Sequence, residues 1–408
     1  MVQESFILPA SSSKPTQHPE FWFCDGSVVL VVRDTMFLVH KTILARHSII
    51  FRDMFSLPQP LSGEDCLPPS PSKPKGYDED ETVLDGYPVV HLYDSPEDMA
   101  SLLYALYDGP KFGDNDRDDF RVVSGILRLA SKYMIDSLRC AALSHLSKAW
   151  PSTLKGWDAR EEVLGDCYSF TEEPRFYPNP VEVITLAREV NAPSLLPSAF
   201  YDLSRYALSD IFEHSQCGGE SEFGPERCGL HALSLADTQK LVLGREGAHC
   251  AVTALIRSLA TEARSNPAHV HTRDAHAHHV GPHAPPSRGF AARTRGHRRA
   301  ESGGRCAAPA ACWRDVCELV DLATQHYLFD RERGAADPLY VAEELALLKG
   351  AGGESCGDPG ASVGGSGGTL DEDGESGTCR ACARSFEVWA KKERERLWRA
   401  IPSWFRLD

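Results

Sequence analysis

Residues 25–55, DGSVVLVVRDTMFLVHKTILARHSIIFRDMF, decide how the N-terminal part of the chain folds. The stretch opens with an Asp-Gly turn signal, and two strand-like runs at 28–32 and 36–39 follow, separated by an Arg-Asp pair. Two residues between such runs is hairpin spacing, although Arg-Asp is not a favoured pair for a type I′ turn. From His40 onward the apolar residues come in doublets that suit one face of a helix. A hairpin that leads directly into helices is therefore predicted.

Periodicity alone fits any α+β core segment, but the residue types in this stretch are more specific. They resemble the signature of the BTB/POZ domain, in which an Asp precedes the first strand and the run F-x-x-H-K-x-x-L-A-x-x-S-x-x-F joins the second strand to two helices. The matching residues are Asp25, Phe37 to Lys41, Leu44, Ala45, Ser48 and Phe51. The hairpin-to-helix reading and the family signature agree.

The resemblance continues downstream in the same order. VVHLYD at 89–94 resembles the family's next strand, and 99–107 with Gly109 resembles its following helix and Y-x-G close. The resemblance covers about residues 22–150. It implies an α+β protein with an N-terminal BTB/POZ fold, followed by a mostly α-helical C-terminal region with disordered insertions.

The same resemblance implies binding residues. By analogy with the family's dimers, Asp25, His40 and Lys41 are expected near the central groove. The alternatives are a simple turn residue for Asp25 and a core histidine with satisfied hydrogen bonds for His40. The aromatic cluster at 21–23 has two readings as well, local core packing or a dimer contact.

Composition shifts divide the chain into five parts. Pro/Ser-rich, acidic and Gly-rich stretches are expected to stay disordered because they bury little apolar surface. The Arg-bearing, His-rich tract offers weak metal binding or nuclear targeting as alternatives to disorder. The parts are a disordered leader (1–20), a BTB/POZ domain (21–150) with a mobile insertion (57–86), a helical region (151–263), a disordered His/Arg-rich insertion (264–305) and a helical C-terminal region (306–408) with a Gly-rich linker (351–377).

Composition also limits the class of protein. A hydrophobic fraction of 42% and a charged fraction of 25% are globular values. No apolar run reaches the roughly 18 residues of a membrane span, and the N-terminus lacks the basic start of a signal peptide. A cytoplasmic or nuclear location is therefore expected, with the 13 cysteines mostly reduced. The net charge of −15 argues against direct binding of nucleic acid by the folded parts.

Catalytic motifs are sparse. The sequence has no G-x-G-x-x-G after a strand, no Walker loop and no H-E-x-x-H. GGSGG at 364–368 formally matches G-x-S-x-G, but it lies in a Gly tract rather than at a strand-to-helix turn. A protein without enzymatic activity is predicted.

Two cysteine pairs form a candidate metal site. Cys306 and Cys312 flank AAPAA, and Cys379 and Cys382 form a C-x-x-C pair after the Gly-rich linker. Two such pairs can supply the four thiolates of a structural zinc site. Cys317 could replace one ligand, because the gap in the first pair is wider than usual. The competing hypothesis is a set of unrelated surface thiols.

The function implied is protein–protein interaction. The BTB/POZ domain would form a homodimer or a hetero-oligomer, and the helical region would hold a partner surface. BTB proteins are often substrate adaptors that bind a cullin in a ubiquitin ligase, or transcriptional co-regulators, and no accessory motif favours either role. The alternative is an enzyme in the C-terminal region that uses the Cys cluster.

Overall fold

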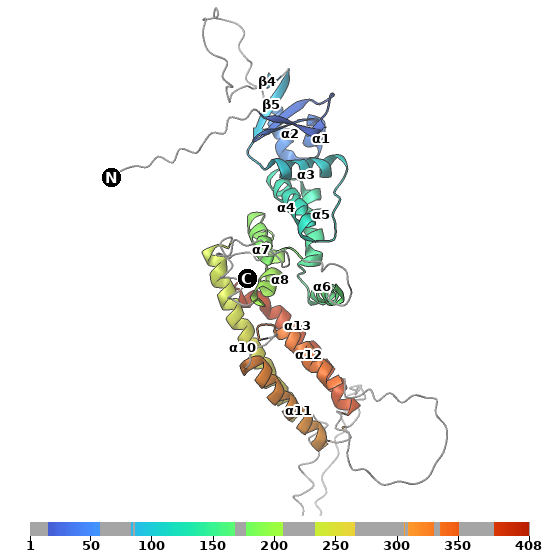
Figure 1. The fold of residues 1–408 in the computed structure, drawn as a ribbon, viewed down its shortest axis with the longest axis vertical. Helices are drawn as coiled ribbons and strands as arrows, with labels where there is room; N and C mark the ends of the chain where they lie inside the picture. The colour runs from blue at the N-terminus through green and yellow to red at the C-terminus, as the bar shows by residue number, and fades with distance from the viewer. Residues whose placement is uncertain are drawn as a thin grey trace, which may run out of the picture. The chain divides into compact units, whose positions relative to one another are not determined.

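The fold is α+β, as the sequence predicts, and its C-terminal part is helical (Figure 1). The described residues form two compact units, one reaching Ala199 and the other beginning at Phe200. The computed structural model describes residues 15–57, 83–84, 86–167, 177–206, 233–265, 306, 309–329, 335–350 and 379–407.

The N-terminal unit is built on a five-stranded sheet with the order β1-β3-β2-β5-β4. β2 and β3 form the predicted antiparallel hairpin, in which Val32 pairs with Thr35 across a two-residue loop. Arg33 in this loop has a φ of 53°, in the left-handed region. β1 runs parallel to β3, and β5 runs parallel to β2. The strands are β1 (Thr16–Trp22), β2 (Val28–Val32), β3 (Thr35–Val39), β4 (Val83–Leu84) and β5 (Tyr87–Leu92).

The hairpin leads straight into two short helices, α1 (Lys41–His47) and α2 (Ile49–Ser56). Ser48 ends the first helix and caps the second, because its Oγ accepts a hydrogen bond from the Phe51 N–H. The same Oγ donates to the Tyr133 carbonyl at 2.6 Å and is buried. One serine therefore sets the turn between the helices and fastens it to a distant segment.

Three longer helices complete the core around the sheet: α3 (Pro96–Tyr107), α4 (Arg117–Lys132) and α5 (Asp136–Ala149). Ser95 and Asp116 cap the first two, each accepting from a backbone N–H in the first turn. The buried carboxylate of Asp94 accepts from both Lys132 and Tyr133 at the end of α4. This network joins the end of the sheet to the helices that pack on it.

Two further helices belong to the same unit, α6 (Leu154–Cys167) and α7 (Pro180–Glu189), followed by the 3-10 turn η1 (Pro193–Leu195). Arg128 on α4 pairs with Glu189 at 2.9 Å. Arg139 on α5 donates to the carbonyl of Val190 at 3.1 Å. These contacts attach α7 to the helices of the core.

The second unit is an assembly of helices. α8 (Leu196–Ser204) leads into it, and η6 (Thr324–Phe329) is a π-helical continuation of α11. α13 packs along α12 and α10, and α11 packs along α10 (Figure 1). The other helices are α10 (Leu235–Ser265), α11 (Pro309–Ala323), α12 (Pro338–Gly350) and α13 (Arg380–Trp404).

Phe405, at the end of α13, closes the core of this unit. Its ring stacks on Phe200 with centroids 5.4 Å apart, and its side chain is fully buried. At Gly244 of α10, an added Cβ would lie 1.9 Å from this ring. The close approach of α13 to α10 therefore requires glycine at this position.

Four expected boundaries are wrong. Residues 16–20 of the expected leader form most of β1, because pairing with β3 stabilises a polar strand that contains Pro19. Residues 83–84 of the expected insertion form β4, paired with β5. α10 continues to Ser265, two residues into the expected His/Arg-rich insertion. The compact units also divide at Ala199, so α6 and α7 join the N-terminal unit. The remaining residues expected to be disordered lie outside the described part of the chain.

Candidate functional site

The first candidate site joins Asp25, His40 and Tyr107 at the end of the hairpin. The Tyr107 hydroxyl accepts the backbone N–H of His40 at 3.0 Å and lies 2.8 Å from His40 Nδ1. His40 Nε2 lies 3.3 Å from Asp25 Oδ1. Asp25 is 78% exposed and His40 only 22%, so the carboxylate is the part of this site that solvent and partners reach.

These contacts assign the proton of His40. Burial raises the pKa of Tyr107, and the nearby Asp25 charge adds to this, so the hydroxyl stays protonated. Its proton is available to Nδ1, because its oxygen already accepts the backbone N–H of His40. The neutral imidazole then carries its proton on Nε2, which faces Asp25. His40 is both a satisfied histidine and the base on which Asp25 is positioned.

Lys41 holds the chain at the start of α1. Its N–H donates to Ser27 Oγ at 2.8 Å, and its ammonium lies 5.8 Å from the centroid of the Phe55 ring. The backbone bond ties the two strand ends together. Whether the ammonium also binds a partner stays a prediction.

The aromatic cluster packs locally. Phe21 is buried and meets Tyr104 edge to face at 4.7 Å, while Phe23 stacks on Tyr107 at 5.0 Å. These contacts lie within one chain and fasten the end of β1 to α3. Of the two readings of this cluster, local core packing explains Phe21.

A family comparison decides what this hairpin unit is. Residues 17–66 match the family model of the BTB/POZ domain. The N-terminal part of the chain carries a BTB/POZ domain. The match takes in β1, the hairpin, α1 and α2, and the expected downstream strand and helix are present as β5 and α3. No curated protein and no solved structure matches the chain.

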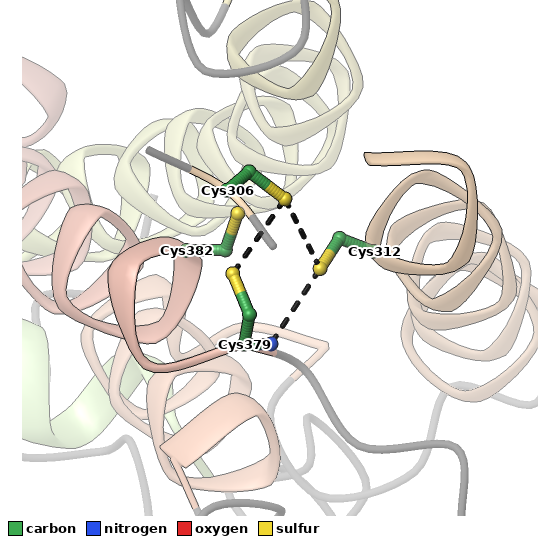
Figure 2. Close-up of side chains that lie close together, drawn as sticks. All are labelled: Cys306, Cys312, Cys379 and Cys382. Carbon is green, nitrogen blue, oxygen red and sulfur yellow. Dashed lines mark hydrogen bonds between the residues drawn. The ribbon is translucent and has the colours of Figure 1, made fainter. Parts of the chain in front are cut away.

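The second candidate site is the cysteine cluster, which lies in the helical unit rather than in the BTB domain. The Sγ of Cys306 lies 3.6 Å from that of Cys312 and 3.5 Å from that of Cys379. All four sulfur atoms, including that of Cys382, lie within 4.8 Å of one another. Figure 2 shows the four side chains directed toward one centre. The structure thus brings both predicted pairs together.

Two helix starts position these thiols. Cys312 lies in the first turn of α11, Cys379 is the N-cap of α13, and Cys382 lies in the first turn of α13. The Cys379 N–H donates to Cys312 Sγ at 3.5 Å. Helix N-termini carry a partial positive charge, which favours thiolate over thiol.

Burial opposes this effect in the absence of a cation. Cys312 and Cys382 are buried, and Cys306 and Cys379 are partly buried. Burial raises the pKa of the Cys382 thiol, and contacts with Cys306 and Cys379 add to the rise. Four neighbouring thiolates would repel one another, so the cluster can ionise fully only around a positive charge.

Cys317 is not part of the cluster. It lies five residues beyond Cys312 on α11 and is partly buried, and the group of four contains Cys306 in its place. The other described cysteines, Cys24, Cys140 and Cys250, are exposed. Nothing in sequence spacing distinguished Cys306 from Cys317, because that choice depends on how the chain approaches α11.

A shallow cavity of about 290 Å³ lies where η6 faces α12. Its walls include Leu319, His326 and Leu348, and the hydroxyl of Tyr327 donates to Glu344 at its side. Burial and this carboxylate raise the pKa of Tyr327. The pairing keeps both groups engaged with each other.

Sequence reasoning missed the role of Tyr107. The Y-x-G close of the family signature contains it, but the pattern predicts only the end of a helix. The partner that gives Tyr107 its role is the backbone N–H of His40, 67 positions earlier. Only the folded hairpin and α3 bring these groups together.

Proposed function

We propose that the protein is a non-enzymatic assembly protein that pairs with a second copy of itself through its BTB/POZ domain. BTB domains mediate protein–protein interaction, and here the domain has its sheet, its helices and a closed core. The helical unit would then present a surface to another protein. The open edge of β1 is the single observation that carries this proposal.

β1 stands at one end of the strand order, with β3 on one side. Four of its seven residues are exposed, and Thr16 donates its N–H to Asp34 in the turn before β3. Successive N–H groups along a strand alternate in direction, so that of Gln17 points away from β3. Such an edge can pair with a strand of another chain, and a second copy offers an identical edge.

The finer roles follow from whatever binds the assembled protein. A cullin partner would make it a substrate adaptor of a ubiquitin ligase, and a transcription factor would make it a co-regulator. The net charge of −15 favours protein partners over direct contact with nucleic acid. Among the described residues, no helix combines the length and apolar character that crossing a membrane requires.

The alternative is an enzyme that uses the cysteine cluster. A catalytic metal keeps an open coordination position for water or substrate, whereas four protein ligands close a tetrahedral site. The four converging thiols favour the closed type, so we assign the helical unit a binding role.

Cross-linking of the full chain tests where copies meet. A mixture of unlabelled and ¹⁵N-labelled protein would be cross-linked, and links between differently labelled peptides come only from two copies. Such links are expected within residues 15–149. Links confined to the helical unit, or none at all, would contradict pairing through the BTB domain.

The matched variants are Gln17→Pro and Gln17→Ala. Proline removes the N–H that points away from β3 and blocks the outer edge without removing a bond to β3. Alanine keeps the N–H. Links between copies are expected to decrease several-fold in Gln17→Pro and to persist in Gln17→Ala; equal decreases would place the contact elsewhere on the domain.

A further inference from the structure

We propose that Cys306, Cys312, Cys379 and Cys382 bind one structural zinc ion, which ties the start of α11 to the start of α13. The proposal rests on four sulfur atoms that all lie within 4.8 Å of one another. It does not depend on the function of the BTB domain, because all four residues belong to the helical unit.

The spacing fits a single ion. Zn–S bonds of about 2.3 Å in a tetrahedron place the sulfurs about 3.8 Å apart. The sulfur of Cys306 lies 3.6 Å from that of Cys312 and 3.5 Å from that of Cys379. A cluster with several iron atoms would hold its cysteines farther apart, since the irons and their sulfides lie between them. Four soft sulfur ligands around one centre select zinc among the common divalent ions.

The surroundings suit a negatively charged centre. Four thiolates around Zn²⁺ leave a net charge of −2. The first turns of α11 and α13 contain no acidic residue, and both helix starts contribute cysteines to the cluster. The Cys379 N–H already points at Cys312 Sγ, the kind of outer bond that orients metal ligands.

Two other uses of the thiols explain less. Disulfide-bonded sulfurs lie about 2.05 Å apart, well below the distances here, and a pair of disulfides would not require all four to converge. Unrelated surface thiols would be scattered and exposed, as Cys140 and Cys250 are. Here two of four are buried, and cysteines up to 73 positions apart meet at one point.

The site has a clear structural task. α13 packs along α12 and α10, and α11 packs along α10. A metal at the two helix starts closes the long stretch of chain between Cys312 and Cys379, 67 positions apart. Closing such a loop restricts the unfolded chain, and a metal that binds only the folded site stabilises it.

The test is the metal content of the full chain. Protein purified under reducing conditions without chelators would be measured by elemental analysis and by native mass spectrometry. We expect one zinc per chain, its loss in the double variant Cys379→Ser/Cys382→Ser, and its retention in Cys317→Ser as the matched control. Metal-free wild-type protein, iron in place of zinc, or zinc that survives the double substitution would overturn the proposal.

Cobalt substitution covers the case in which the double variant fails to fold. Wild-type protein loaded with Co²⁺ is expected to show intense sulfur-to-cobalt charge-transfer absorption and the visible bands of a tetrahedral site. A weak octahedral spectrum would show that the four thiolates do not bind together, and it would count against the site without any variant.

Discussion

The Sγ atoms of Cys306 and Cys379 lie 3.5 Å apart, although 73 positions of sequence separate the two residues. The short distance joins the segment before α11 to the N-cap of α13. A contact of this kind makes the stability of the helical unit depend on what the sulfurs bind. The first prediction follows from it.

Removal of zinc should destabilise the helical unit alone. A ligand present at 100 times its dissociation constant stabilises a fold by about 2.7 kcal/mol, so a strong chelator is expected to lower the free energy of unfolding by at least that amount. Hydrogen exchange should increase in the first turns of α13, near Cys382, and stay constant in the hairpin at 28–39. Unchanged exchange in α13 after complete zinc removal would contradict a structural role.

Loss of the Tyr107 hydroxyl should weaken the hairpin-to-helix junction. Tyr107→Phe leaves the His40 N–H and Nδ1 without this partner, which is expected to cost about 1–2 kcal/mol in urea unfolding. Tyr104→Phe is the matched control. Its hydroxyl donates only to the exposed Glu20, so a change within about 0.5 kcal/mol is expected. Equal losses in both variants would show that the His40 contacts add nothing.

Ser48→Ala should be among the more costly single-atom changes in the BTB domain. It removes the cap of α2 and leaves the Phe51 N–H and the Tyr133 carbonyl unpaired in a buried place, an expected loss of about 2 kcal/mol. Ser56→Ala removes only an exposed bond to Arg52 and should change stability by less than about 0.5 kcal/mol. Thermal unfolding of both variants gives the comparison.

Gly244→Ala should lower the melting temperature of the helical unit. The new Cβ would lie 1.9 Å from the Phe405 ring, and overpacking of this kind costs about 1–3 kcal/mol, more than the gain of about 1 kcal/mol in helix propensity. At Gly247 the nearest atom is Trp404 Cβ at 3.0 Å, so Gly247→Ala should be close to neutral. A stabilised Gly244→Ala variant would show that α13 does not pack on α10 in this way.

The hairpin was predictable because its information is local. The two-residue spacing between 28–32 and 36–39 and the change of period at His40 are both visible in the sequence. The polar strand β1 was not, because its residues form a strand only through pairing with β3. α6 was missed as well, since its apolar residues follow no clear helical stripe.

The cysteine site was predictable only in part. The C-x-x-C pair at 379–382 signals a metal ligand pair, and the pair at 306–312 has unusual spacing. Which thiols meet depends on the packing of α10, α11 and α13, and no local pattern encodes this. For the same reason Tyr107 acquired a role only when its contact with His40 was known.

The most direct test of self-association through the BTB/POZ domain is the mass of the full chain in solution. Sedimentation velocity at micromolar concentrations, with Gln17→Pro beside the wild-type protein, measures it without labels or tags. We expect twice the mass of one chain for the wild type and a shift toward monomer for the variant. A strictly monomeric wild-type protein across the whole concentration range would contradict the account.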